Sequence, residues 1–173
     1  QNYILDKVQR LINVLVEVGV IQMISEDEYT LVAGVVSEIN PILVTRISSV
    51  WNNFEDFGPK DLVAFFSLFT DVRVNEECRI YPGFSNYCDQ TFMNEKIKNF
   101  EKVRSELLVL EESHGIHMKD TGLDGLCYDL IDCMYAWCDC TNEAECKTVI
   151  SVIEANGVSI GDFTKAILKI SSL

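Results

Sequence analysis

Apolar residues recur at spacings of three and four along most of the chain, which is the pattern of helices that bury one face. The stretch from Phe92 to Glu112 carries this pattern without an intervening Gly or Pro, and it predicts the longest helix. The stretch from Leu62 to Phe69 is apolar almost all round, which predicts a short helix at the centre of the core. The predicted helices cover residues 3–18, 41–54, 62–69, 92–112, 123–138 and 143–155, and a last helix follows Ser159.

Turn and capping residues separate these patterns. Gly19 is a stop signal for the first helix, and Gly157 is one for the helix before the last. The range 21–36 predicts a turn or brief hairpin, and the range 74–89 predicts an irregular surface loop. No run of alternating residues is long enough for a sizeable sheet, so the sequence predicts an all-α fold, a bundle of about six to eight helices. The candidate capping residues are Thr141 or Asn142 for one helix and Ser159 or Asp162 for the last.

Composition narrows the class of protein. The chain has 173 residues, 48% of them apolar and 24% charged, which is typical of a folded globular domain. Its apolar runs are shorter than the roughly 18 residues that a membrane span requires, so no membrane partner is expected. The net charge of -13 argues against a general nucleic-acid binder, because phosphate binding depends on clustered Lys and Arg. Any contact with nucleic acid would need a local basic patch.

Two further features concern the chain's setting. It starts at Gln1 and runs straight into a helical pattern without a signal peptide, which we interpret as a piece of a longer protein. Its seven cysteines are an odd number in a chain that is too large to need disulfides for stability. We therefore expect an intracellular protein, in the nucleus or the cytoplasm.

The sequence offers few candidates for catalysis or metal binding. It lacks a Gly-rich phosphate loop, a Gly-x-Ser-x-Gly motif and a His-Glu-x-x-His motif. His114 and His117 lack a third ligand at metal spacing, and the acidic run 26–28 lacks the ligand order of a calcium loop. No catalytic and no metal-binding residue is predicted. Four clustered cysteines are candidate zinc ligands, although their spacing favours free thiols inside helices: Cys133, Cys138, Cys140 and Cys146.

The last helix carries the one basic feature of interest. Lys165 and Lys169 are four residues apart and therefore lie on the same helix face. The spacing alone favours two solvated lysines opposite an apolar stripe, and a role in binding needs further support.

That support comes from a resemblance to a known family. The stretch from Leu130 to Trp137, Leu-Ile-Asp-Cys-Met-Tyr-Ala-Trp, is similar to Leu-Met-x-Val-Val-Tyr-x-Trp-Ala in the DSHCT domain. This domain is the C-terminal helical domain of superkiller-type, exosome-associated DExH-box RNA helicases. Further segments resemble its motifs in the same order, and together they cover residues 19–173. These segments are Gly34 to Ile39, Trp51 to Asp61, Leu62 to Phe69 and Gly161 to Lys169.

The resemblance implies a helical bundle that packs on the helicase motor domains and closes the ring around single-stranded RNA. It implies RNA contact from the last helix, where Lys165 stands in place of the family's arginine and Lys169 lies one turn on. Lysine is a point charge for phosphate and lacks the forked contact of arginine. Arg46 or Ile47 lies where the family has an acidic residue near the RNA path, and an exchange to Arg46 would reverse the charge there.

The resemblance also implies a larger enzyme. ATP and Mg would bind in motor domains that are absent from this chain, which by itself would not hydrolyse ATP. The expected partners are those motor domains, single-stranded RNA and an exosome-like complex. Residues 1–18 would be a leading helix that joins the preceding part, and residues 19–173 would form the DSHCT-like bundle. Two alternatives remain open: an all-α protein-interaction module without nucleic-acid contact, and a zinc-stapled or redox protein built on the cysteines.

Overall fold

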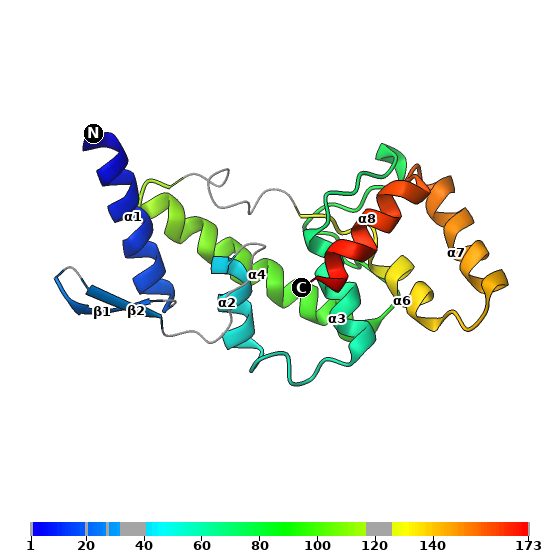
Figure 1. Cartoon of the computed structure of the whole chain (residues 1–173), viewed down its shortest axis with the longest axis horizontal. Helices are drawn as coiled ribbons and strands as arrows, with labels where there is room; N and C mark the ends of the chain where they lie inside the picture. The colour runs from blue at the N-terminus through cyan, green and yellow to red at the C-terminus, as the bar shows by residue number, and fades with distance from the viewer. Residues whose placement is uncertain (1, 20, 27, 32–40, 117–125, 173) are drawn as a thin grey trace. The chain divides into compact units, whose positions relative to one another are not determined.

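The computed structural model describes residues 2–19, 21–26, 28–31, 41–116 and 126–172. In these ranges the chain is mostly helical, with one short β-hairpin, and the all-α prediction is confirmed (Figure 1). By its internal contacts the chain divides into two compact units. Unit 1 comprises Gln1–Glu55 and Phe100–Asp124, and unit 2 comprises Asp56–Asn99 and Gly125–Leu173. The predicted division into residues 1–18 and 19–173 stays a prediction.

Unit 1 is built from helices around a small apolar core. Its hairpin pairs β1 and β2 antiparallel, with Ile21 opposite Leu31, which confirms the hairpin expected within the range 21–36 as far as residue 31. The core consists of Val14, Leu43, Ile47, Phe100, Val103 and Leu107, all at most 5% exposed. The elements are α1 (Asn2–Val18), β1 (Ile21–Ser25), β2 (Glu28–Leu31), α2 (Pro41–Val50) and the C-terminal part of α4 (Thr91–Ser113).

Helix α2 ends earlier than the sequence predicted. The expected helix extended to Phe54, but α2 ends at Val50, and residues Asn52, Asn53 and Phe54 have positive φ angles of 48°, 56° and 60°. Asparagine tolerates this left-handed conformation better than most residues. The Asn53 amide donates to the Ser48 carbonyl, five residues back, at 2.8 Å, and the Ser48 hydroxyl donates to Asn53 Oδ1 at 3.0 Å, so the hydrogen bonds leave the α-helical pattern here.

Unit 2 is organised around α3 (Pro59–Phe66) and the 3₁₀ turn η1 (Ser67–Phe69). Ala64, Phe65 and Leu68 are 0% exposed, which confirms that the apolar stretch 62–69 lies at the centre of a core. Helix α3 packs against α6. The remaining elements are the turn η2 (Glu76–Cys78), the N-terminal part of α4, α6 (Ile131–Asp139), α7 (Glu143–Ala155) and α8 (Ile160–Ser171).

Helix α6 begins later than predicted. A helix was expected from Leu123, but residues 126–130 are not helical, and residues 123–125 lie outside the described ranges. Tertiary hydrogen bonds occupy the backbone and side chains just before α6. The Cys127 amide donates to the Leu68 carbonyl at 2.8 Å, and Asp129 Oδ1 accepts from the Ile80 amide at 2.6 Å. These long-range contacts override the local helical pattern.

The other helix ends follow their caps. Asn142 Oδ1 accepts from the Glu145 amide at 3.0 Å at the start of α7, and Ser159 Oγ accepts from the Asp162 amide at 3.1 Å at the start of α8. Among the described helices α4 is the longest, at 23 residues, as predicted. No helix in the described ranges combines the length and apolar character of a membrane span.

The turn between α7 and α8 is joined to the loop that follows η1. The Asn75 amide donates to the Asn156 carbonyl at 2.8 Å. Gly157 adopts a φ of +88° beside the Asn75 side-chain amide, and a Cβ atom at this position would collide with that amide. Glycine is therefore required here both for its conformation and for its size.

Asn94 holds the loop before α4, and its loss is expected to release that loop. The side chain is 8% exposed, and its Oδ1 accepts from the amides of Tyr87 (2.6 Å) and Cys88 (3.1 Å). Asn94→Ala leaves two buried donors without an acceptor, so amide hydrogen exchange at Tyr87 and Cys88 should accelerate about tenfold or more. Glu95→Ala, an exposed change on the same helix, is the control, and unchanged exchange in Asn94→Ala would contradict this assignment.

Candidate nucleic-acid interface

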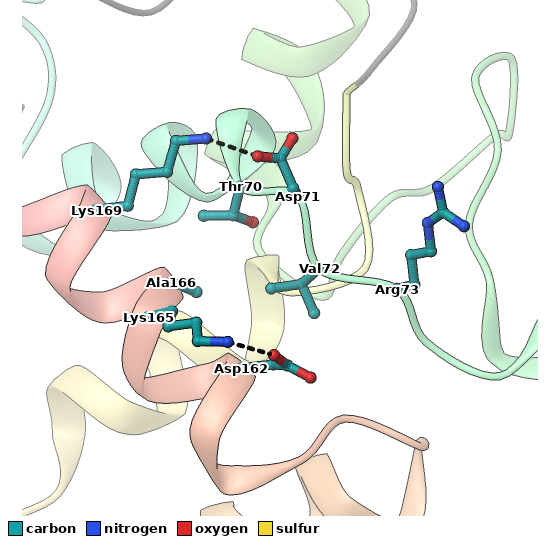
Figure 2. A pocket seen from close by; sticks show the side chains of 8 residues that line it. All are labelled: Thr70, Asp71, Val72, Arg73, Asp162, Lys165, Ala166 and Lys169. Carbon is teal, nitrogen blue, oxygen red and sulfur yellow. Dashed lines mark hydrogen bonds and ion pairs between the residues drawn. The ribbon is translucent and has the colours of Figure 1, made fainter.

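The predicted lysines of the last helix line a cleft within unit 2. One wall is α8, and the other is the segment 70–73 that follows η1 (Figure 2). The cleft has a volume of about 390 Å³. Its lining residues are Thr70, Asp71, Val72, Arg73, Asp162, Lys165, Ala166 and Lys169.

The sequence places the two walls by simple means. Phe163, Ala166 and Ile170 are at most 9% exposed and anchor one face of α8 in the core, which turns Lys165 and Lys169 outward on the cleft side. On the other wall, Thr70 is 1% exposed, and its hydroxyl donates to the Ser67 carbonyl at 2.7 Å. The residues that follow Thr70 therefore leave the core at a fixed point.

Each lysine of the cleft is paired with a carboxylate. Lys169 Nζ lies 3.0 Å from Asp71 Oδ2 on the opposite wall, and Lys165 Nζ lies 3.4 Å from Asp162 Oδ1 on its own helix. Figure 2 shows both ion pairs as dashed lines, and the side chains of both pairs are exposed to solvent. Exposed pairs of this kind contribute about 0–1 kcal/mol, so a stronger anion is able to compete for the lysines.

Arg73 is the third cation of the cleft. Nothing in its sequence position, just before a predicted irregular loop, indicated that it would lie beside the lysines of α8. It is exposed, and it makes no ion pair with any residue of the described ranges. Three cations against two carboxylates give the lining a net charge of +1, whereas the chain as a whole carries -13. The cleft is therefore a local exception to the acidic surface, of the kind that phosphate contact requires.

Asp162 is held in its charged form. The Ser159 hydroxyl donates to Asp162 Oδ2 at 2.9 Å, and this bond, followed by Lys165, lowers the pKa of Asp162 from its ordinary value of 3.8. The same carboxylate lies in the first turn of α8, where a negative charge interacts favourably with the helix dipole. Asp162 therefore serves the helix start as well as the ion pair.

Arg46 is not part of this cleft. It is exposed on α2 in unit 1, whereas both lysines belong to unit 2. Its role in RNA binding stays a prediction, and it is separate from the role proposed for the cleft.

The clustered cysteines do not form a metal site. In the described part of the chain, no group of three or more His, Cys, Asp or Glu side chains is placed to hold a metal ion. The thiols of Cys140 and Cys146 interact as a pair, and the pKa of Cys140 is raised by desolvation and then by its hydrogen bond with Cys146. None of the four clustered cysteines forms a disulfide within the described ranges, and all are half-buried: Cys133, Cys138, Cys140 and Cys146.

Among the other polar candidates, His114 has a structural partner, and two residues lie outside the described ranges. His114 Nε2 lies 2.7 Å from Glu17 Oε2, which joins the end of α4 to α1. His117 and Asp27 lie outside the described ranges. Asp56 pairs with Lys96 at 3.4 Å, an interaction within unit 2.

Comparison with known proteins adds no assignment. No family model matches the chain, and no curated protein or solved structure matches it either.

The buried thiols are expected to resist alkylation. Burial raises the pKa of Cys88 and of Cys127 to about 11 from 9.0, and the two residues are 7% and 6% exposed. When the pKa of a thiol rises by about two units, its thiolate fraction at a given pH below the pKa falls about 100-fold. With iodoacetamide at mildly alkaline pH, mass spectrometry should find the exposed Cys78 modified first and these two last. Equal alkylation rates of these cysteines in the folded protein would contradict this order. As a control, the same cysteines should be alkylated at equal rates in denaturant.

The start of α8 should weaken only in strong acid. Because the folded-state pKa of Asp162 lies below its ordinary value of 3.8, its contribution is complete above that value and is lost as the pH falls through the folded pKa. Hydrogen exchange in the first turn of α8 should therefore accelerate in that range. Ser159→Ala removes the main cause of the shift, so the pKa of Asp162 measured by carbon NMR should rise. An unchanged pKa would contradict the assignment.

Proposed function

We propose that this chain is the non-catalytic C-terminal domain of an ATP-dependent RNA helicase, which packs on the motor domains and guides single-stranded RNA with α8. The observation that carries the proposal is the cleft, in which Lys165 and Lys169 of α8 share one surface with Arg73. The ordered resemblance to the DSHCT domain supports it. The protein would act inside the cell, in the nucleus or the cytoplasm, and an exosome-like complex is a further proposed partner.

The charges of the cleft fit a moving strand rather than a tightly held one. Phosphate contacts supply sequence-independent affinity and set position. Here the lining is only +1 in a chain of -13, so the cleft would add modest affinity to that of the attached motor domains. ATP and Mg would belong to those motor domains. The role of α8 is then to guide the strand, with lysines as point charges along its path.

The lysines are tested by removing both. In Lys165→Ala/Lys169→Ala, we expect weaker binding of a fluorescent oligouridylate, and a log–log salt dependence that is shallower by about 1.4, from about 0.7 for each lost phosphate contact. Fluorescence anisotropy over a salt series measures both quantities. In the helicase that carries this domain, unwinding should slow.

A matched control separates a local effect from a general one. Lys60→Ala/Lys147→Ala removes two exposed lysines of the same unit that also stand in ion pairs, with Asp139 and Glu143 respectively, and neither lines the cleft. Equal effects of the two double variants on affinity and salt dependence would contradict a role for the cleft.

An all-α protein-interaction module is the second candidate, and α1 favours it. Apolar side chains are exposed along the first half of this helix, including Tyr3 (77%), Ile4 (67%) and Leu5 (66%). Exposed apolar surface of this kind is typical of protein contact sites. If the chain fails to bind the oligouridylate even at low salt, this second candidate is favoured over the first.

A further inference from the structure

The two carboxylates in the cleft are held in different ways. Asp162 is fixed, because the Ser159 hydroxyl donates to its carboxylate at 2.9 Å and its own amide donates back to Ser159 Oγ at 3.1 Å. Asp71 is much freer. Its side chain is 87% exposed, and in the described part of the chain its carboxylate is bonded to Lys169.

This difference determines which of the two carboxylates turns away from its lysine at the lower cost. If the Asp162 carboxylate turned away from Lys165, it would also lose the hydrogen bond from the Ser159 hydroxyl. If Asp71 turned away from Lys169, a single exposed ion pair would be lost, and such pairs contribute little to stability. The Lys165 side chain is 81% exposed and that of Lys169 is 39% exposed, so an incoming anion is able to reach both lysines, and at Lys169 the group that it has to displace is Asp71.

Arg73 lies two residues beyond Asp71 on the same wall. Its guanidinium offers the planar, forked contact to phosphate that the lysines of α8 lack. In Figure 2 its side chain stands at the other end of the segment from Asp71, away from both ion pairs. Within the described ranges it has no hydrogen bond or ion pair that a phosphate would first have to break.

We infer that the segment 70–73 sets the affinity of the cleft for the phosphodiester backbone: Asp71 is an internal competitor for Lys169, and Arg73 is a third phosphate-binding residue. This inference rests on the proposed function, since it concerns RNA at the same cleft. In this inference Asp71 lowers the affinity of the cleft for phosphate, and Arg73, two residues further on, raises it.

Asp71→Asn is the central test. It leaves the shape of the cleft unchanged and frees Lys169, so the 173-residue chain should bind a fluorescent oligouridylate about two- to fivefold more tightly. The log–log salt dependence should not become shallower, because Lys169 then contacts phosphate without competition from Asp71. Asp56→Asn is the control, because Asp56 is 73% exposed, pairs with Lys96 at 3.4 Å in the same unit and lies outside the cleft lining.

Arg73→Gln should weaken binding about three- to tenfold. Its control is Arg79→Gln, since Arg79 is an exposed arginine on the same loop that pairs with Glu76 at 3.7 Å and does not line the cleft. The residues substituted in these four single variants are all exposed: Asp56, Asp71, Arg73 and Arg79. The thermal unfolding temperature of each variant should therefore match that of the parent chain.

The outcomes separate this inference from the proposed function. If Lys165→Ala/Lys169→Ala leaves binding unchanged, the proposed function fails. If that variant weakens binding but Asp71→Asn binds no more tightly than Asp56→Asn, only the competitor role of Asp71 is overturned. The gain of Asp71→Asn should also vanish in a Lys169→Ala background, and a gain that persists there would overturn the competition between Asp71 and phosphate for Lys169.

Discussion

The packing of Phe65 at the centre of unit 2 is the interaction on which the cleft depends. Its ring is 0% exposed and meets Phe57, Phe66 and Phe69 edge-on, at centroid distances of 6.0, 5.5 and 5.7 Å. Such pairs add about 0.5–1.5 kcal/mol each beyond the apolar area that they bury. Because α3 is fixed in this way, η1 and the segment that follows it leave the core in one direction only, and that segment is one wall of the cleft.

The same core explains how an acidic chain keeps a small basic surface. Phe163, Ala166 and Ile170 are buried, so α8 has no rotational freedom about its axis, and its lysines have to face the cleft. The carboxylates opposite and beside them keep the local charge low. A surface that is both positioned and weakly charged is consistent with the proposed guiding role, because a strand held by strong contacts would not move past it.

Local patterns in the sequence were sufficient to predict most of the helices but not the residues that line the cleft. The stripes of α4, α7 and α8 and the caps Asn142 and Ser159 are encoded within a few residues, and the structure agrees with them. The early end of α2 coincides with positive φ angles at residues 52–54, and the late start of α6 depends on tertiary hydrogen bonds such as that of the Cys127 amide. Asp71 and Arg73 were missed for a related reason. They come from an irregular segment, and only the tertiary packing brings them to α8.

The turn at Gly157 gives the cleft an unequal pair of ends. Near this turn, the backbone hydrogen bond from Asn75 to Asn156 ties the loop that continues from segment 70–73 to the chain just before α8. At the Lys169 end, the walls are joined by an ion pair between flexible side chains. The two walls are thus joined by the backbone near one end of the cleft and by side chains at the other, so a substitution at Asp71 or Lys169 alters only the second of these connections.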